Sequence, residues 1–257
     1  LREDAAPPAT RETAPPALPM APLASRLPHP LSAASWAGPA DTLDSVPQAW
    51  AEEAGEGGFG GDGSGYALHD DQAHDGELLW LASAAQRRVL GVEEDGAVAQ
   101  VFGSGAWGKR DGDAASCSFA LPGALAVHEG FVVVADAQMH ALRAIDVANA
   151  EVVTWVGDGS FGADEVGGGF GADQPLSSPA GMVSHDGGLY ICQAGTDQIW
   201  QVDPMTGAAM AWLGADYGGE PLAQPVALAQ EAEQLWLAEA GAGTLTCVDL
   251  AHVEVCE

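Results

Sequence analysis

Three glycine motifs have the residue types and spacing of a loop that binds the phosphates of a dinucleotide. They are Gly-x-Gly-x-x-Gly runs that begin at Gly55, Gly103 and Gly157. In a dinucleotide-binding fold such a run lies between a parallel strand and a helix, with an acidic residue about 20 residues further on. Here each run follows a short β-prone stretch, and two of them recur at the same place in a sequence repeat. We therefore expect turns between strands, where glycine supplies positive φ angles.

Carboxylates follow these glycine motifs and offer the chemistry of a weak calcium site. They are Asp62, Asp111, Asp113, Asp164 and Glu165, and none has the spacing of an EF-hand loop. We favour the simpler interpretation that they cap backbone N–H groups in turns. The densest group of transition-metal ligand types, expected in an exposed loop, comprises His69-Asp70-Asp71 and His74-Asp75. Ligand identity without geometry does not establish a site, so we assign no catalytic residue, metal or cofactor.

The four cysteines lack the spacing of a zinc site or of a redox-active Cys-x-x-Cys pair. Cys247 and Cys256 flank the last expected hairpin, so direct pairing of its strands would make them cross-strand neighbours. A disulfide would follow if their Cβ atoms came within about 4.5 Å. The alternative is that both are ordinary strand residues with free thiols.

These residues lie on a repeat that occupies the chain from about residue 66 onward. Four β-prone runs end at a small or polar residue: Leu79–Ser83, Val132–Asp136, Leu189–Gln193 and Leu235–Glu239. Ten residues after the last residue of each run comes an acidic residue that directly follows a β-branched one: Glu93, Asp146, Asp203 and Asp249. The unit recurs about every 50 residues, which is the length of a propeller blade. The sequence therefore predicts an all-β chain, with a β-propeller of about four recognisable four-stranded blades in residues 51–257.

Each unit reads as four short strands. In the best-formed unit we expect them at Ala124–Val127, Phe131–Ala135, Ala141–Asp146 and Glu151–Val156. Prolines open successive units, where a missing N–H costs no ladder hydrogen bond: Pro122, Pro179 and Pro225. We expect Asp136 and its counterparts Ser83, Gln193 and Glu239 to cap the turn between the second and third strands. This set contains no histidine, and the chain has no nucleophile elbow or zinc-protease motif.

The best-formed unit resembles the NHL repeat, which has a Pro-Gly-hydrophobic opening, a Tyr-Val-Ala-Asp strand and an Asn-His-x-Ile strand. The matching residues are Pro122–Val127, Val134–Asp136 and His140–Asp146. Gln174–Pro179, followed by Ala194–Trp200, resembles the branch in which an NHL propeller is joined to a thioredoxin-like domain. The resemblance covers roughly residues 66–257 and implies a propeller. NHL propellers usually have more than four blades, so this one is either minimal or incomplete.

Residues 1–50 differ in kind from the repeat. Most of the 16 prolines lie at or before Pro47, whereas Gly38 alone of the 34 glycines precedes Gly55. Without apolar periodicity this segment cannot bury a core, so we expect an extended Pro/Ala-rich arm that contacts the propeller or a partner chain. The expected anchors for a partner are Met20, Leu27, Leu31 and Trp36 of the arm, with Trp107 from a loop. The alternative for both tryptophans is that they fold back onto the propeller.

The charge balance limits the partners. With 37 acidic and 8 basic residues the net charge is −29, which repels nucleic acid and anionic membrane surfaces. We expect partner proteins with basic surfaces, or cations; the alternative is a solubility adaptation to a salty or crowded compartment. No apolar run approaches the ~20 residues of a membrane span. The chain starts at Leu1, so we expect that an upstream segment was removed or that the chain is a fragment.

The sequence favours a non-catalytic accessory or scaffolding subunit of a larger complex, with an organellar membrane complex among the candidates. The alternatives are an enzyme or a small-ligand or metal binder that uses the central channel, and a redox-linked regulatory protein. The last follows from the thioredoxin-linked branch, although no Cys-x-x-Cys supports it here. A known member of that branch resides in the thylakoid lumen, so the resemblance implies an extracytoplasmic or organellar lumen.

Overall fold

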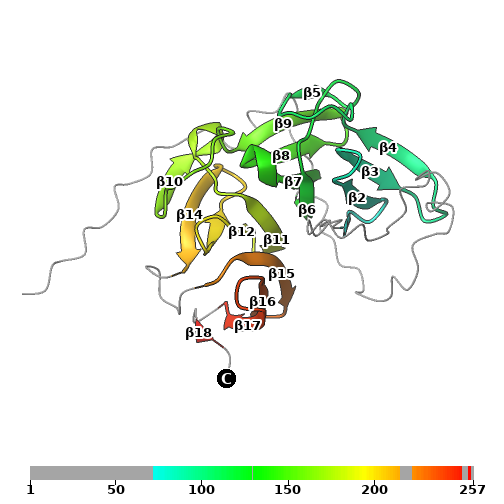
Figure 1. Cartoon of the computed structure of the whole chain (residues 1–257). Helices are drawn as coiled ribbons and strands as arrows, with labels where there is room; N and C mark the ends of the chain where they lie inside the picture. The colour runs from blue at the N-terminus through cyan, green and yellow to red at the C-terminus, as the bar shows by residue number, and fades with distance from the viewer. Residues whose placement is uncertain (1–71, 129, 215–221, 251–253, 256–257) are drawn as a thin grey trace, which may run out of the picture.

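The computed structural model describes residues 72–128, 130–214, 222–250 and 254–255. Four antiparallel sheets follow one another along the chain and are arranged as the blades of a propeller (Figure 1). This confirms the predicted all-β fold and the four predicted blades. The arm at residues 1–50 and its anchors Met20, Leu27, Leu31 and Trp36 lie outside the described residues.

The first two blades show the strand order of a propeller. Blade 1 consists of β1 (Gln72–His74), β2 (Leu79–Ser83), β3 (Arg88–Val92) and β4 (Val98–Phe102). Blade 2 consists of β6 (Pro122–His128), β7 (Phe131–Asp136), β8 (Ala141–Asp146) and β9 (Glu151–Val156), with β5 (Gly112–Asp113) added outside β9. Consecutive strands pair antiparallel, so each blade is a meander.

The last two blades repeat this order. Blade 3 consists of β11 (Pro179–His185), β12 (Gly188–Gln193), β13 (Gln198–Val202) and β14 (Ala208–Leu213), with β10 (Gly167–Phe170) outside β14. Blade 4 consists of β15 (Pro225–Glu231), β16 (Gln234–Glu239), β17 (Thr244–Asp249) and β18 (Glu254–Val255). Two short 3₁₀ turns, η1 (Ala137–Met139) and η2 (Gly171–Asp173), are the helical elements of the described residues. None of the described helical segments is long and apolar enough to cross a membrane.

Prolines begin the first strand of blades 2, 3 and 4, as predicted. Pro122, Pro179 and Pro225 are the first residues of β6, β11 and β15. The pairing register of each of these strands shifts just after its proline, because the ring lacks an N–H for the ladder.

Three apolar clusters lie between consecutive blades and hold the propeller together. The first joins blades 1 and 2, the second joins blades 2 and 3, and the third joins blades 3 and 4. The middle strands are buried on both faces, which explains why β7 and β8 read as continuous rather than alternating apolar runs. Within the described residues, no cluster joins blade 4 to blade 1, and these blades form the two ends of an arc (Figure 1).

The glycine motifs form turns after the outer strands β4 and β9. Gly103 and Gly105 have φ angles of 113° and 81°, and Gly157 and Gly159 have φ angles of 105° and 94°. Residues other than glycine rarely adopt such φ angles. The predicted inter-blade turns are confirmed for these two motifs, and the motif at Gly55 lies outside the described residues.

Candidate interaction surface

Asp136 anchors the chain that enters its blade. Its two carboxylate oxygens accept the backbone N–H groups of Ala120 and Leu121, at 2.9 and 2.8 Å. The side chain makes no capping bond to η1, so the predicted cap of the turn between the second and third strands is wrong. The carboxylate turns inward because these two N–H groups precede β6 and have no ladder partner there. Burial raises the pKa of Asp136, although the two N–H donors and Arg143 favour the charged form.

Two counterparts of Asp136 make the same kind of bond. Ser177 N donates to Gln193 Oε1 at 2.8 Å, and Ala223 N donates to Glu239 Oε2 at 2.8 Å. In all three blades the donor lies 16 residues before the acceptor. In blade 1, Ser83 accepts Gln86 N at 3.4 Å, so the predicted cap of the turn between the second and third strands is confirmed there. The residues Asp136, Gln193 and Glu239 therefore act as structural anchors of the repeat.

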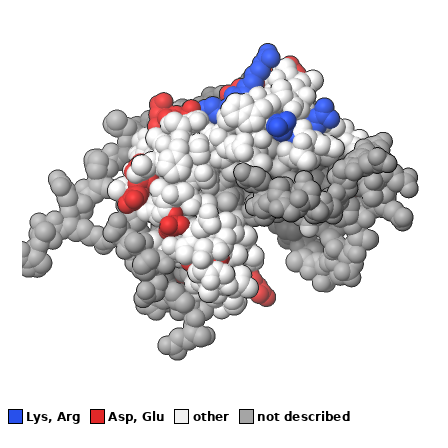
Figure 2. All heavy atoms as spheres, viewed as in Figure 1, with Lys and Arg blue, Asp and Glu red and all other residues white. Residues whose placement is uncertain are grey.

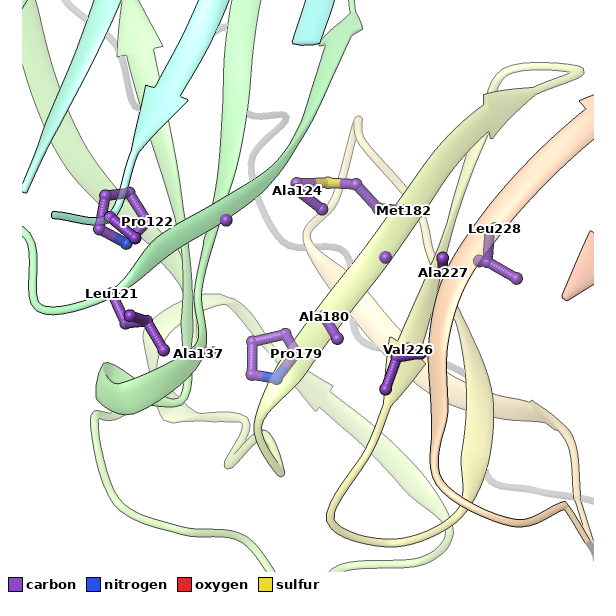
Figure 3. A pocket seen from close by; sticks show the side chains of 13 residues that line it. Leu121, Pro122, Ala124, Ala137, Pro179, Ala180, Met182, Val226, Ala227 and Leu228 are labelled. Atoms are coloured by element: carbon purple, nitrogen blue, oxygen red, sulfur yellow. The ribbon is translucent and has the colours of Figure 1, made fainter. Parts of the chain in front are cut away.

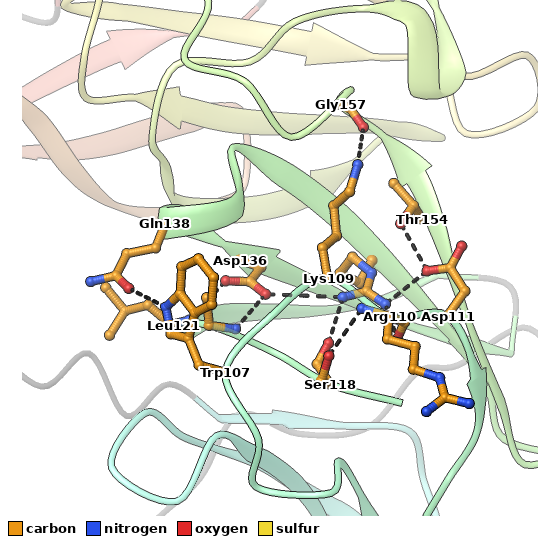
Figure 4. A network of polar contacts seen from close by, with 12 residues as sticks. Trp107, Lys109, Arg110, Asp111, Ser118, Leu121, Asp136, Gln138, Thr154 and Gly157 are labelled. Atoms are coloured by element: carbon orange, nitrogen blue, oxygen red, sulfur yellow. Dashed lines mark hydrogen bonds and ion pairs between the residues drawn. The ribbon is translucent and has the colours of Figure 1, made fainter. Parts of the chain in front are cut away.

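A buried arginine fixes the loop that leads into blade 2 (Figure 4). The Arg143 guanidinium donates to Ser118 O at 2.9 Å and to Arg110 O at 3.0 Å. It also pairs with Asp111 Oδ1 at 2.8 Å and lies 4.0 Å from Asp136 Oδ2. The Arg143 side chain is fully buried. Sequence reasoning missed this residue, since nothing local distinguishes an inward arginine on a strand from an exposed one.

The loop that this network holds also carries Trp107, whose side chain is exposed (Figure 4). Trp107 is 61% exposed, and its Nε1 donates to Gln138 Oε1 of η1 at 3.1 Å. Nearby, Lys109 Nζ donates to Asp158 O at 2.8 Å and so links this loop to the next glycine turn. Trp107 contacts the propeller through its indole N–H and leaves most of its ring in solvent.

A second exposed aromatic lies at the equivalent place of the next blade. Phe161 is 57% exposed, and its ring meets the His140 ring edge-on at a centroid distance of 5.4 Å. Trp107 and Phe161 both precede the third glycine of a Gly-x-Gly-x-x-Gly motif. Phe161 also lies close to Gly195, which stands two residues after Gln193 as Gln138 does after Asp136. We call Trp107 and Phe161 the loop aromatics; the repeated motif would have found Phe161 had it been read as Gly-x-Gly-x-aromatic-Gly.

Around the propeller axis, the first strands of blades 2, 3 and 4, together with Ala84 of blade 1, line an apolar pocket of about 190 Å³ (Figure 3). The lining includes Leu121, Pro122, Pro179, Met182, Val226 and Leu228. None of the residues that line it has a titratable or nucleophilic side chain. The pocket itself therefore offers no group for acid–base or nucleophilic chemistry.

Two of the acidic loop residues cap turns, whereas Asp111 binds Arg143 and Thr154 instead of the predicted turn N–H groups. Asp113 Oδ1 accepts the N–H groups of Ala115 and Ser116, at 3.0 and 2.9 Å. Hydrogen bonds from Ser116 lower the pKa of Asp113. Asp164 accepts Val166 N at 2.9 Å and Gly167 N at 3.0 Å. Burial acts to raise the pKa of Asp164, but these hydrogen bonds outweigh it and the pKa is lowered. The turn-capping interpretation is confirmed for Asp113 and Asp164.

The candidate metal ligands near the start of blade 1 also bind turn N–H groups. His74, at the end of β1 rather than in a loop, accepts Gly76 N at 2.8 Å. Asp75 accepts Leu78 N and Trp80 Nε1, both at 2.7 Å. Among the described residues no three His, Cys, Asp or Glu side chains are grouped to hold a metal ion. His69, Asp70 and Asp71 lie outside that part of the chain.

The cysteines differ in state. Cys247 on β17 is disulfide-bonded, whereas Cys117 and Cys192 are buried free thiols. Burial raises the pKa of both free thiols, which disfavours the reactive thiolate. The expected partner of Cys247, Cys256, lies outside the described residues, so that pairing stays a prediction.

Curated proteins similar to this chain carry the name of the repeat. NHL repeat-containing protein 2 of Bos taurus is 34% identical over 135 residues, which cover 49% of this chain. The human protein of the same name is 34% identical over 132 residues. Four antiparallel blades with this sequence similarity decide the assignment. The chain is a β-propeller whose repeats are similar to those of NHL repeat-containing proteins. No family model matches the sequence of this chain.

The NHL-repeat propeller matches only a part of its longer relatives. The matched stretch spans 19% of the bovine protein. Protein SUPPRESSOR OF QUENCHING 1, chloroplastic, of Arabidopsis thaliana is 31% identical over 168 residues, 60% of this chain and 16% of that protein. The activities of these whole proteins therefore remain separate from what the propeller alone shows.

Two solved structures have a similar chain fold over part of their length. An auxiliary nutrient binding protein from Bacteroides ovatus has a TM-score of 0.50 at 9% identity, over 69% of this chain and 46% of that chain. Virginiamycin B lyase from Staphylococcus aureus has a TM-score of 0.49 at 16% identity, over 70% of this chain and 51% of that chain. At such identities the similarity concerns the fold alone.

Proposed function

We propose that this NHL-repeat propeller is a non-catalytic interaction module, an accessory or scaffolding subunit that docks partner proteins on its loop aromatics. The observation that carries the proposal is the pair of exposed rings at repeat-equivalent loop positions, Trp107 at 61% and Phe161 at 57% exposure. Exposed aromatic side chains are enriched among residues that dominate binding energy at interfaces.

The loop aromatics are supported as an interaction anchor needs to be. Trp107 is oriented by its hydrogen bond to Gln138, and Phe161 by its contact with His140. The buried Arg143 network fixes the loop below Trp107 (Figure 4). A preorganised ring loses less conformational entropy on binding than a mobile one, so rigid support favours affinity.

The charge around Trp107 narrows the kind of partner. Four basic residues surround this loop: Arg87, Arg88, Lys109 and Arg110. Figure 2 shows the positive side chains on one part of this face, with a few carboxylates beside them and the others spread over the rest of it. We therefore propose that a neutral or acidic segment of the partner contacts Trp107, and that any basic partner surface meets the acidic blades 3 and 4.

The test uses the full chain with Trp107→Ala and Phe161→Ala, each alone and together. The control is Met205→Ala, which removes an apolar side chain of 45% exposure from the turn between β13 and β14. Proteins that co-purify with the wild type at low salt from the source material are identified and then quantified for each variant. We expect loss with the double variant and retention with the control, at unchanged thermal stability. Equal capture by all variants would refute the loop aromatics as the docking site.

The arm and the location are further parts of this proposal. We propose that residues 1–50 extend the docking area through Met20, Leu27, Leu31 and Trp36, since an isolated segment of this composition cannot bury a core. Deleting residues 1–45 is expected to leave the propeller folded and to weaken its retention by partners. The chloroplastic relative supports an organellar location, for which a lumen is the specific proposal.

A further inference from the structure

Every blade has two different faces, and the sequence distinguishes them. In β2, β7 and β12 the residue three positions before the last residue of the strand faces the following blade: Trp80, Val133 and Tyr190 are 0%, 2% and 8% exposed. The residues on either side face the preceding blade, as Val132 and Val134 do toward blade 1. We call these the forward and rear faces. Each of the three interfaces in the chain packs a forward face on a rear face.

Blade 4 has a forward face with nothing described against it. Trp236 occupies the position of Trp80, Val133 and Tyr190 but is 39% exposed. Leu245 is 74% exposed and pairs with Ala238. Its counterparts in blades 1, 2 and 3 are all 0% exposed: Val89, Leu142 and Ile199. A solvent-facing sheet face is normally polar, so an apolar residue kept at an inter-blade position indicates a covered face.

Blade 1 has the complementary surface, a rear face against which no other blade is described. Leu90 and Val92 within it are 8% and 3% exposed, and the positions around them are more open. Leu79 and Leu81 match positions that are 0% to 1% exposed in blades 2, 3 and 4, yet both are half-buried. On the outer strand β4, Val98 and Val101 are 44% and 42% exposed and pair with Val92 and Leu90 of the same face. The face is apolar across three strands: Leu79, Leu81, Leu90, Val92, Val98 and Val101.

We propose that the forward face of blade 4 docks on the rear face of blade 1 of a second copy of this chain. Among the described residues the two faces belong to blades at opposite ends of the arc, and no core cluster joins them (Figure 1). A second copy supplies both missing surfaces, in the geometry that the chain already uses three times. Such a head-to-tail contact closes a ring of two copies when it forms twice, once at each end.

Net charge sets the conditions of association. Two copies at −29 each repel one another, while the faces that meet are apolar. Salt screens repulsion between exposed charges and leaves apolar burial intact. The proposed self-association therefore strengthens as ionic strength rises, opposite to an interface held by oppositely charged groups.

Sedimentation velocity of the full chain over a range of concentrations and salt measures the association. We expect a concentration-dependent dimer that is more populated at high salt. Leu245→Glu and Val101→Glu each place a charge on one of the two faces, at positions exposed in the single chain. Each variant alone is expected to sediment as a monomer, while the control Met205→Glu, at 45% exposure away from both faces, still dimerises.

Mixing the two variants tests the head-to-tail geometry. A chain with Leu245→Glu keeps an intact blade 1 face, and a chain with Val101→Glu keeps an intact blade 4 face. The mixture is therefore expected to recover a heterodimer, which a contact between two identical faces would not. A wild-type chain that stays monomeric at high concentration and salt would overturn the proposal; this is also the outcome if other residues of the same chain cover blade 4. Dimerisation unaffected by Leu245→Glu would overturn it as well.

Discussion

At the scale of single residues, the anchors show that hydrogen-bond geometry, rather than residue type, is what the repeat retains. In blades 2, 3 and 4 the side chain of the anchor residue accepts a backbone N–H from the chain that enters the blade. The acceptor is a carboxylate in Asp136 and Glu239 and an amide in Gln193. Gln193 replaces a charge by an amide without loss of the bond, because only an acceptor oxygen is required at that place. Catalysis would require a particular chemistry to be kept, which this set does not do.

The number of N–H groups held by an anchor sets its energetic weight. Asp136 accepts two N–H groups and Gln193 accepts one. We expect Asp136→Ala to lower the free energy of unfolding by about 2–4 kcal/mol, and Gln193→Ala by about 1–2 kcal/mol, because each leaves its N–H donors unsatisfied. Urea denaturation measures both. Equal losses for the two variants would contradict this account of the anchors.

His140 makes the contact between blades 2 and 3 sensitive to pH. Its Nδ1 accepts Ser178 N at 3.1 Å, so the ring is unprotonated at that atom. Burial lowers the pKa of His140, and Asp158 only partly opposes this. The folded-state pKa is below the unfolded value, so the stability from His140 is present above about pH 6.5 and is lost as pH falls through the folded pKa.

We expect the free energy of unfolding to fall between about pH 7.5 and pH 5.5, and to fall less in His140→Asn. Asparagine tolerates the left-handed backbone that His140 adopts, with φ of 46°. Urea denaturation at both pH values gives the comparison, with His74→Asn as the control at the exposed end of β1. If the two variants showed the same pH dependence, burial of His140 would not be its source.

At the scale of elements, strand positions were predictable where the pattern was local. β8 and β9 have the expected bounds, and β7 extends one residue further, to Asp136. β6 starts at Pro122, two residues earlier than expected. β5 and β10 were not predicted, because short glycine-rich segments have no apolar pattern and pair with a strand far along the chain.

The candidate site was predictable only in part for the same reason. The lack of a core around Trp107 followed from its local sequence. The role of Asp136 did not, because its partners lie 16 and 15 residues upstream, beyond any local turn pattern. The burial of Arg143 likewise depends on Asp111 and Ser118, which reach it only through the fold. Contacts between distant residues thus determine what a propeller loop does.

Close approach of first strands around the axis depends on Gly181 of β11. A Cβ at this position would collide with the backbone of Ala227 in β15. We therefore expect Gly181→Ala to force the two strands apart and to destabilise the protein by about 1–3 kcal/mol. The control is Gly188→Ala, whose Cβ would meet the movable end of the Gln201 side chain. Thermal unfolding compares the two, and a Gly181→Ala variant as stable as the control would contradict this packing.

At the scale of the whole molecule, charge and apolar surface are unevenly distributed. Basic residues gather near the loop of Trp107, and blade 4 has no basic residue (Figure 2). The forward face of blade 4 and the rear face of blade 1 carry the exposed apolar residues Leu245 and Val101, whereas Trp107 and Phe161 lie on loops. The two surfaces that we propose for association therefore differ in charge, and we expect them to respond differently to salt.

The net charge of −29 also acts on folding itself. Like charges are closer together in the folded chain than in the unfolded one, so their repulsion favours unfolding, and salt screens it. We expect the thermal midpoint to rise as sodium chloride increases from about 0.01 M to about 0.3 M, over which the Debye length shortens several-fold. The measurement uses Leu245→Glu, so that salt-induced dimerisation does not contribute. A matched series in sucrose separates screening from general exclusion of cosolute, because sucrose stabilises without screening charge. If sucrose raised the thermal midpoint and sodium chloride did not, repulsion among the carboxylates would not destabilise the fold. Turn capping of the kind seen at Asp113 and Asp164 would then offset that repulsion.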